Sequence, residues 1–463
     1  MDYYYYVLPY YGPGSPAAAS NVVKANHPWG GRRTARRELP DTTSEILVFA
    51  DQLLPGEMTE AQIEWCAENL VGTQKIRYSQ ANAFRQYNDD FIVVGYHLGN
   101  GAGPIGNVHG DDWDGDADWP YVDLHEDWFI HPAGSSQPNG RCLQQVWGWY
   151  AMDPNSDWQD YLAANLLQLI GEDHFDGWFI DSCHQPYDMD PAVWWPSGQE
   201  WYEYFTPKLH EMLRTVNLAA DAHPLDPFII PNAGQYVTTL SDIKYYGDDW
   251  ACDGIMIEGY AHWSPGRYFA EVDWVLQQNR ILDHQAHGLA TILQTGISTD
   301  TIDPVNVTDR LFVFGSYLLV KGDHTYINWL GDDGLDWIQA DIGQWYPEFD
   351  IDEDEGFPWG APQGTPETIA DLYVAEHEDH GVTCGPFYRR NYPYGFVLVN
   401  PSTTAVNFYV PWTMQSLSVD GGGNVLADGT TTGSYSWDAM SMGETVVLEP
   451  HTALIVLDVF DGS

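Results

Sequence analysis

The chain has 463 residues, 44% of them hydrophobic, and its 67 acidic and 18 basic side chains give a formal net charge of −49. This length and hydrophobic content exclude global disorder and are sufficient for a large domain plus a smaller one. The charge argues against nucleic acid as a partner, because phosphate binding needs clustered bases, and no apolar run approaches the roughly 18 residues of a membrane span.

Residues 1–44 form a basic and aromatic extension ahead of the first predicted strand. The tyrosine-rich start has neither a basic n-region nor a long apolar run, so we recognise no signal peptide. Five of the 18 bases lie within the first 37 residues, including the arginine pairs at 32–33 and 36–37. No apolar segment follows these pairs, which argues against a twin-arginine export signal. The arm either docks on a neighbouring acidic subunit or wraps around its own protein.

Apolar runs alternate with helical patterns from residue 45 to residue 345. The predicted strands are 45–51, 74–77, 91–97, 176–181, 227–232, 253–258, 289–294 and 324–328. The predicted helices are 59–70, which starts with a capping box at Thr59, 158–170, 200–218, one that ends at 287, and 305–320. Such alternation predicts a parallel α/β assembly, and eight strands favour a (β/α)₈ TIM barrel over an open doubly wound sheet. No GxGxxG follows the first strand, which also argues against a dinucleotide fold.

An acidic and aromatic insertion fills residues 105–150. Its run Asp111 to Asp118 alternates carboxylates with other residues but lacks the terminal Glu of an EF-hand, so a solvated loop is favoured over a Ca²⁺ site. We predict no other metal and no cofactor. The five cysteines show no CxxC spacing, which argues against a disulfide scaffold and a Cys-ligated zinc site but leaves one bridge open.

The pattern changes after residue 345. Residues 346–366 are acidic and then rich in Pro and Gly, as in a connection between domains. Short alternating runs follow at 395–400, 405–410, 444–448 and 452–457, separated by glycine turns. Residues 367–463 therefore predict an antiparallel β-sandwich domain.

Two predicted strands share one design and each ends in a carboxylate. Asp176-Gly-Trp-Phe-Ile-Asp181 closes the fourth strand and Asp253-Gly-Ile-Met-Ile-Glu258 closes the sixth. Alternate strands of a barrel place their tips in one layer, so Asp181 and Glu258 can face each other at its mouth. Hydrolysis of a glycosidic bond needs such a pair. We assign Asp181 as nucleophile and Glu258, among apolar neighbours, as general acid/base, while retaining and inverting mechanisms both stay open.

Other residues at strand ends and in the insertion are candidates for contact with sugar. Aromatic rings of the insertion can stack on sugar rings, and Trp128 is chosen from a group that also holds Trp147, Trp149 and Tyr150. Trp178 lies within a strand and is assigned to the core. The predicted substrate-binding residues are Tyr96, His97, Trp128, His184, Asn232, Tyr260, Gln294 and Asn328.

From residue 45 onward the chain resembles the glycosyl hydrolase-like family with a TIM barrel and a C-terminal β-sandwich domain, in a halophilic form. The matching segments are 153–158, 175–181, 254–260 and 448–456. The resemblance implies retaining chemistry by Asp181 and Glu258. The sequence departs from the amylase pattern, because Phe179 stands where amylases have an Arg two residues before the nucleophile. That argues against a true α-amylase.

The leading hypothesis is a glycoside hydrolase that acts on an extracellular or cell-surface glycan. Its acidic surface would be tolerated near 1 M salt, where the Debye length is about 3 Å, so a hypersaline setting is predicted over an ordinary secreted enzyme. The alternative is a structural or glycan-binding subunit of an extracellular assembly such as a halophilic virus tail. The missing signal peptide and the basic arm favour this second hypothesis. The predicted location is extracellular or virion-associated.

Overall fold

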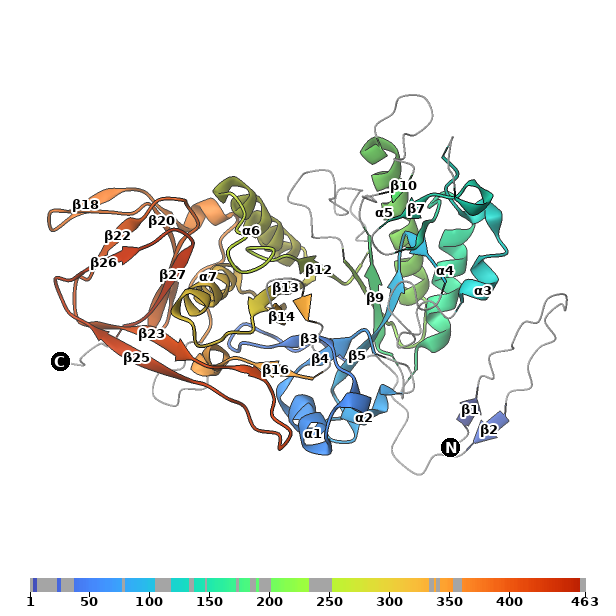
Figure 1. Ribbon diagram of the computed structural model, residues 1–463, viewed down its shortest axis with the longest axis horizontal. Helices are drawn as coiled ribbons and strands as arrows, with labels where there is room; N and C mark the ends of the chain where they lie inside the picture. Colours follow the sequence, from blue (N-terminus) through green and yellow to red (C-terminus); the bar gives the residue numbers. More distant parts are fainter. Residues whose placement is uncertain are drawn as a thin grey trace.

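The structure is a computed structural model (Figure 1). It describes residues 3–5, 23–25, 37–76, 80–104, 118–132, 137–145, 148–171, 175–183, 189–190, 201–232, 252–332, 337–338, 342–352 and 360–458.

Two parallel sheets form the centre of the molecule. The first has the order β11-β9-β5-β4-β3, and the second places β12, β13 and β14 side by side with a short antiparallel β15. Single parallel bridges, Val48 to Ile327 and Asn232 to Met256, join the two sheets at both ends. The strands are β3 (Phe49–Gln52), β4 (Gly72–Gln74), β5 (Ile92–Leu98), β9 (Gly177–Asp181), β11 (Phe228–Pro231), β12 (Gly254–Glu258), β13 (Ala290–Ser298), β14 (Thr325–Asp332) and β15 (Trp337–Ile338).

Helices lie between successive parallel strands in the described part of the chain, and residues 233–251 between β11 and β12 lie outside it. The first α-helix is capped by Thr59, whose side chain and that of Gln62 form the expected capping box. The α-helices are α1 (Glu60–Asn69), α2 (Asn82–Arg85), α3 (Trp119–Val122), α4 (Trp158–Leu166), α5 (Trp201–Asp221), α6 (Glu271–Ala286) and α7 (Pro304–Val320). The 3-10 helices are η1 (Pro55–Glu57), η5 (Glu126–Trp128), η6 (Pro138–Gly140), η7 (Leu167–Leu169), η11 (Pro347–Asp352) and η12 (Ile369–Leu372). The predicted α/β class with a parallel core is thus confirmed.

The Asp-Gly pair that opens β9 and β12 has a common structural reason. The carboxylates of Asp176 and Asp253 accept the backbone N–H of Val93 (2.9 Å) and Ile229 (2.8 Å), each on the preceding strand. The glycines that follow allow the next strand to approach. A Cβ at Gly177 would lie 2.3 Å from the Phe228 carbonyl oxygen, and one at Gly254 would lie 2.8 Å from that of Ala290. The shared motif therefore fixes two strands whose far ends carry Asp181 and Glu258.

Strands from the predicted insertion and from the chain on either side of it form a small antiparallel sheet with the order β10-β7-β8-β6. Its strands are β6 (Gly101–Ala102), β7 (Leu143–Gln144), β8 (Tyr150–Ala151) and β10 (Met189–Asp190). Beside it the rings of Tyr121, Trp128, Trp158 and Tyr161 pack against one another. Residues 111–117 of the Ca²⁺ candidate lie outside the described residues.

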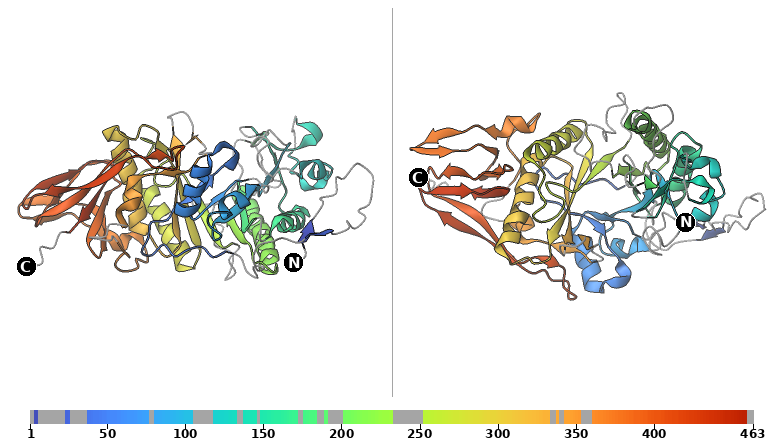
Figure 2. Two further views of the ribbon diagram at one scale, coloured as in Figure 1. Left: turned by 90° about the horizontal axis from the view of Figure 1, so that it is seen from below. Right: turned by 45° about the horizontal axis from the view of Figure 1, so that its top comes forward.

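The C-terminal part is antiparallel, as predicted. Its six-stranded sheet has the order β17-β20-β21-β27-β23-β25, and the β22–β26 pair packs against it through a second apolar core that includes Phe396, Leu398 and Phe408. These strands lie beside α6 and α7, at the opposite end of the molecule from α3 and α4 (Figures 1 and 2). The strands are β16 (Gln344–Trp345), β17 (Tyr373–Val374), β18 (His377–Asp379), β19 (Val382–Cys384), β20 (Phe387–Tyr392), β21 (Gly395–Asn400), β22 (Val406–Tyr409), β23 (Met414–Asp420), β24 (Gly423–Asn424), β25 (Ser434–Met440), β26 (Thr445–Leu448) and β27 (Thr452–Leu457).

The described part of the N-terminal arm has one strand pair, β1 (Tyr3–Tyr5) with β2 (Val23–Ala25). Arg37, at the end of the arm, is 4% exposed, and its guanidinium bonds to the buried Asp176 at 2.8 Å. Arg37 therefore binds its own protein, and its charge is not available to a neighbouring subunit. Arg32, Arg33 and Arg36 lie outside the described residues.

The five cysteines are all free and buried, so the bridge that the sequence left open is absent. Burial is the main cause that raises the pKa of the Cys66 thiol, to about 12. None of the helices in the described ranges combines the length and the apolar character that crossing a bilayer would take.

Candidate active site

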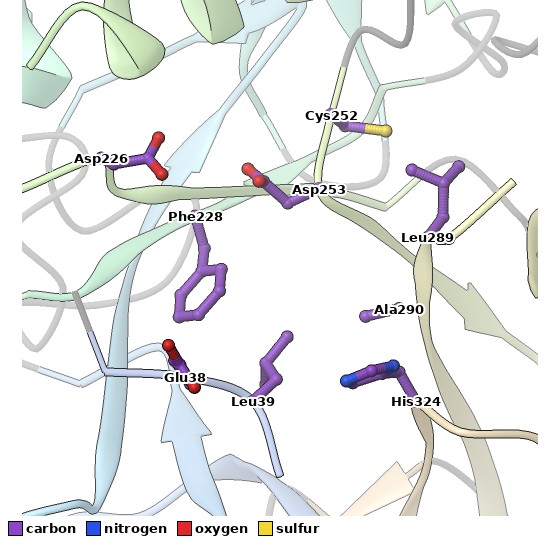
Figure 3. A pocket seen from close by; sticks show the side chains of 10 residues that line it. Glu38, Leu39, Asp226, Phe228, Cys252, Asp253, Leu289, Ala290 and His324 are labelled. Atoms are coloured by element: carbon purple, nitrogen blue, oxygen red, sulfur yellow. The ribbon is translucent and has the colours of Figure 1, made fainter. Parts of the chain in front are cut away.

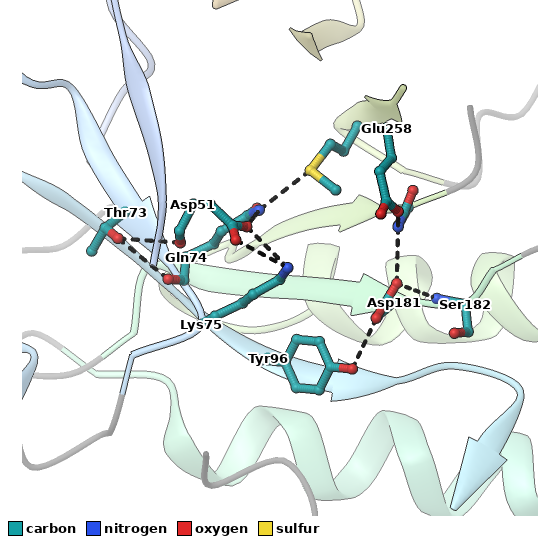
Figure 4. Close-up of polar contacts among 10 residues, drawn as sticks. Asp51, Thr73, Gln74, Lys75, Tyr96, Asp181, Ser182 and Glu258 are labelled. Carbon is teal, nitrogen blue, oxygen red and sulfur yellow. Dashed lines mark hydrogen bonds and ion pairs between the residues drawn. The ribbon is translucent and has the colours of Figure 1, made fainter. Parts of the chain in front are cut away.

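The two predicted catalytic carboxylates lie close together. Asp181 is the last residue of β9 and Glu258 is the last residue of β12, so both stand at the carboxyl ends of parallel strands. Each side chain is partly exposed at the end of an otherwise buried strand. Figure 4 shows the two side chains pointing toward one another.

One amide joins the two acids. Asn232, the residue after β11, is 2% exposed, and its Nδ2 donates to Asp181 Oδ1 at 2.9 Å and to Glu258 Oε2 at 2.7 Å. Since both oxygens lie within these distances of one nitrogen, they can be at most about 5.6 Å apart. The sequence predicted Asn232 as a sugar contact, but the structure makes it the donor that holds the carboxylate pair.

Asp181 accepts further hydrogen bonds that favour its charged form. The Tyr96 hydroxyl donates to its Oδ2 at 2.9 Å, and the backbone N–H of Ser182 donates to its Oδ1 at 2.6 Å. Ser182 has a φ of 54°, a left-handed conformation that costs energy in residues with a Cβ and is often retained at functional sites. Hydrogen bonds to a carboxylate stabilise the anion. These contacts suit Asp181 to act as an ionised group.

A second polar group that the sequence reasoning missed lies beside the pair. The Lys75 ammonium is 3.0 Å from Asp51 Oδ1, and Gln74 Nε2 donates to the same Asp51 oxygen and to Met256 Sδ (3.3 Å). The predicted strand 74–77 is observed two residues earlier, as β4, because Lys75 has a φ of 57° that ends the extended conformation. One signal was present in the sequence, since Asp51 closes its predicted strand just as Asp181 does.

Two predicted sugar contacts continue the row that begins at Glu258. Gln294 on β13 pairs in register with Glu258, and Asn328 on β14 pairs with Gln294, so the three side chains share one side of the sheet. Both amides are 1% exposed. Within the described residues, Gln294 Nε2 and both polar side-chain atoms of Asn328 have no hydrogen-bond partner. Buried amides in this state are uncommon, and a bound hydroxyl group would satisfy them.

Three predicted sugar contacts are placed elsewhere by the structure. His97 neighbours Tyr96 and therefore points to the other side of β5, where its ring lies near Trp158 and its Nε2 lies 3.5 Å from Asp118. Tyr260 is fully buried, and its hydroxyl donates to Gln278 on α6 at 3.0 Å. Trp128 is 5% exposed and stacks on His125 at 4.0 Å, so neither of its faces is open to a sugar.

The remaining aromatic candidates are also packed or outside the described ranges. Trp149 is 2% exposed, and Tyr150 stacks on Trp119. Trp178 belongs to the core as predicted, because it is 2% exposed and its Nε1 donates to the Leu166 carbonyl oxygen. His184 and Trp147 lie outside the described residues. No cluster of His, Cys, Asp and Glu in the described part of the chain is arranged to hold a metal ion.

A cavity of about 550 Å³ lies away from the carboxylate pair (Figure 3). Its lining includes Phe228, Asp253, Ala290 and His324, which stand at or next to the first residues of β11, β12, β13 and β14. The cavity is therefore at the amino ends of the strands. Since active sites of parallel α/β folds form at the carboxyl ends, we assign this cavity no role in catalysis.

Comparison with known proteins gives one family. A sequence profile of the hypothetical glycosyl hydrolase family 15 matches residues 77–379, well over half of the chain, and confirms the resemblance expected from the sequence. No curated protein matches the chain.

Several solved glycoside hydrolases are similar in structure. The glycoside hydrolase domain of PelA from Pseudomonas aeruginosa has 11% identity and a TM-score of 0.39, with 64% of this chain and 98% of that chain covered. A GH27 β-L-arabinopyranosidase from Geobacillus stearothermophilus has 10% identity and a TM-score of 0.45, with 91% and 98% covered. A pullulanase from Bacillus acidopullulyticus has 10% identity and a TM-score of 0.42, with 94% and 64% covered. At these identities and scores the likenesses carry no information on the sugar.

Proposed function

The chain belongs to the hypothetical glycosyl hydrolase family 15, and on that premise we propose that it hydrolyses glycosidic bonds with Asp181 and Glu258. One observation carries the assignment of the pair. Asn232 Nδ2 donates to both carboxylates, which limits the distance between the two bonded oxygens to about 5.6 Å. Carboxyl groups about 5–5.5 Å apart are typical of retaining enzymes, and inverting enzymes need roughly 6.5–9.5 Å to admit a water. The retaining mechanism is therefore the better fit.

The chemistry follows from the surroundings of each acid. Glu258 donates its proton to the glycosidic oxygen as the bond to the anomeric carbon breaks, and Asp181 attacks that carbon to give a covalent glycosyl-enzyme ester. Glu258, now ionised, takes a proton from a water whose oxygen attacks the anomeric carbon, and Asp181 leaves as the free carboxylate. The donors on Asp181, from Tyr96, Ser182 and Asn232, favour the ionised form that a nucleophile needs.

We also propose that the eight parallel strands form a (β/α)₈ barrel. The bridges Val48–Ile327 and Asn232–Met256 support this, because they join the edges of the two parallel sheets at both junctions. The alternation of strands and helices supports it further. In such a barrel the carboxylate pair, Gln294 and Asn328 stand at the carboxyl-terminal mouth. The two amides would bind hydroxyl groups of the sugar beside Glu258, since their polar atoms lack partners within the described residues.

The substrate that we propose is a glycan or polysaccharide outside the cell, in a medium of high salt. The net charge of −49 supports high salt, because screening at about 1 M shortens the range of self-repulsion to about 3 Å. Assays in dilute buffer would then measure a destabilised protein. Measurements therefore belong in about 2 M NaCl.

The test is a screen of polysaccharides and aryl glycosides for release of reducing ends in about 2 M NaCl. We expect Asp181→Asn and Glu258→Gln each to lower the rate at least about 1,000-fold, since both groups act in the transition state. Asp89→Asn is the matched control, because Asp89 is 81% exposed and lies near Arg37 instead of the pair. Full activity in either active-site variant would refute the assignment, and proton NMR of the first-formed anomer separates retention from inversion.

The alternative from the sequence, a glycan-binding subunit of an extracellular assembly, stays a prediction. This alternative relies on the basic arm to dock on a neighbouring subunit. Arg37, at the end of the arm, does not support it, because Arg37 binds Asp176 of the same chain. Sedimentation in about 2 M NaCl tests it: a ring or fibre supports the assembly, and a monodisperse monomer contradicts it.

A further inference from the structure

The Lys75 ammonium lies beside the carboxylate pair and takes no part in the bond-breaking steps proposed above. Lys75 is one of five lysines in the chain, and its side chain is 11% exposed. Successive residues of a strand point to opposite sides, so Lys75 would normally point away from the side that Gln74 faces. The left-handed conformation at Lys75 (φ 57°) breaks this alternation. As a result, Lys75 Nζ and Gln74 Nε2 both contact Asp51.

The position of the ammonium group relates it directly to Asp181. Lys75 Nζ lies 5.2 Å from the centre of the Phe179 ring and 6.0 Å from the centre of the Tyr96 ring. Phe179 is two residues before Asp181 and shares its side of β9, and the Tyr96 hydroxyl donates to Asp181. The ammonium thus lies near the ring of Tyr96, whose hydroxyl holds the proposed nucleophile (Figure 4), and near the ring of Phe179 on the same strand as Asp181.

The charge of Lys75 is maintained despite its burial. Burial lowers the pKa of the ammonium, but the negative charges of Asp51, Asp181 and Glu258 outweigh this effect and raise the pKa above its usual value. Lys75 is therefore a permanent positive charge near neutral pH. The influence is mutual, because a charge that both acids stabilise also stabilises the ionised form of both acids, and it acts more strongly on Asp181 than on Glu258.

The pair needs such a charge. Two carboxylates with oxygens at most about 5.6 Å apart oppose each other's ionisation, and Asp51 adds a third negative group. The other titratable groups on the elements around them do not supply a cation. In the described part, Tyr96 and the fully buried Cys183 carry no positive charge, His97 points to the other side of β5 with its Nε2 3.5 Å from Asp118, and His262 Nδ1 lies 3.4 Å from Asp309.

We propose that Lys75 is a positioning residue whose ammonium, oriented by Asp51, keeps Asp181 ionised beside a protonated Glu258 and so separates the roles of nucleophile and acid. This inference rests on the proposed function for its catalytic meaning. The electrostatic part stands on its own, because it concerns the protonation of two carboxyl groups and requires no substrate.

The experiment is a pH titration of the carboxyl carbons by ¹³C NMR, on protein labelled at Asp and Glu carboxyls in about 2 M NaCl, with Asp181→Asn and Glu258→Gln to assign the two signals. In Lys75→Met we expect the first ionisation of the pair to move up by about one pH unit or more. Lys75→Arg should restore it to within a few tenths of a unit. Lys208→Met, a lysine on α5, is the control that should leave the titration unchanged.

A second variant gives the opposite sign. Asp51→Asn removes the carboxylate that partly neutralises Lys75, so the first ionisation of the pair should move down. This variant keeps the test decisive if Lys75→Met does not fold by circular dichroism. Unchanged titrations in folded Lys75→Met, or in Asp51→Asn, would overturn the inference. Hydrolysis by Asp181→Asn would instead overturn the proposed function, and the NMR result would be unaffected.

Discussion

The buried triad of Asp176 with Arg37 and Arg85 gives the sharpest stability prediction. The Asp176 carboxylate lies 2.8 Å from Arg37 Nη1 and 2.6 Å from Arg85 Nη2, and the three side chains are 4%, 3% and 5% exposed. It also accepts the Val93 N–H, which fixes β9 against β5. Asp176→Asn keeps the size of the side chain but removes its charge, so two buried guanidinium groups lose their counterion.

The magnitude follows from burial. Removing one partner of a buried ion pair costs about 3–5 kcal/mol, because the remaining charge stays desolvated. For a chain of this length the unfolding entropy is on the order of 1 kcal/mol per kelvin, so Tm should fall by roughly 3–5 °C. The matched control is Asp89→Asn. Asp89 lies 3.7 Å from Arg37 Nη2 but is 81% exposed, and an exposed pair contributes about 0–1 kcal/mol before screening by salt.

The assay compares thermal and urea unfolding of the wild type and both variants, followed by circular dichroism in about 2 M NaCl. We expect a clear loss in Asp176→Asn and no more than about 1 kcal/mol in Asp89→Asn. Equal unfolding midpoints for the two variants would refute the reasoning, because burial would then not determine how much each ion pair contributes to the free energy of unfolding.

Three further predictions concern the site, the surface and the thiols. Asn232→Ala should lower kcat/KM about 10- to 100-fold, since each hydrogen bond to a charged group contributes about 1.5–3 kcal/mol. The control is Asn400→Ala, because the buried Asn400 Nδ2 donates only to backbone carbonyls in the described contacts. An equal loss of kcat/KM in Asn400→Ala would contradict a role of Asn232 at the carboxylate pair. Lowering NaCl from about 2 M to 0.1 M should lower Tm, because the Debye length grows from a few Å to about 10 Å around a net charge of −49, and an unchanged Tm would argue against adaptation to salt. Native protein at about pH 8 should react slowly with a thiol reagent, and all five thiols should react only in concentrated urea, because all five are buried. The pKa of the Cys66 thiol is raised to about 12, so this thiol stays protonated until the pH is far above neutral. Fast reaction of the folded protein would show that the thiols are accessible.

The sequence predicted the elements that carry the site because those elements rest on local patterns. The apolar runs predicted at 176–181 and 253–258 became β9 (Gly177–Asp181) and β12 (Gly254–Glu258), which end at the predicted carboxylates, and Thr59 forms the predicted capping box. The Asp-Gly pair that begins both runs was also visible in the sequence, although its structural role was not. Only the neighbouring strands show that each Asp accepts a backbone N–H and that each Gly leaves room for a carbonyl oxygen.

The sequence did not predict side-chain directions, because these depend on more than a residue's place in the chain. Tyr96 and His97 both stand near the end of β5, yet alternation sends only Tyr96 to Asp181. Trp128 and Tyr260 have the right residue type for a sugar contact, but neighbouring rings and α6 enclose them. Burial of this kind is the sum of contacts from distant segments, which no local pattern contains.

The sequence by itself therefore determined the alternation of strands and helices, the two strand-end carboxylates and the extreme negative charge, because each of these follows from residue type and spacing. The tertiary structure alone decided how the acids are held. Asn232 lies 51 residues from Asp181 and 26 from Glu258, and Lys75 reaches Asp51 only through a left-handed backbone. Such contacts depend on which strands become neighbours and on single backbone angles, and folding fixes both.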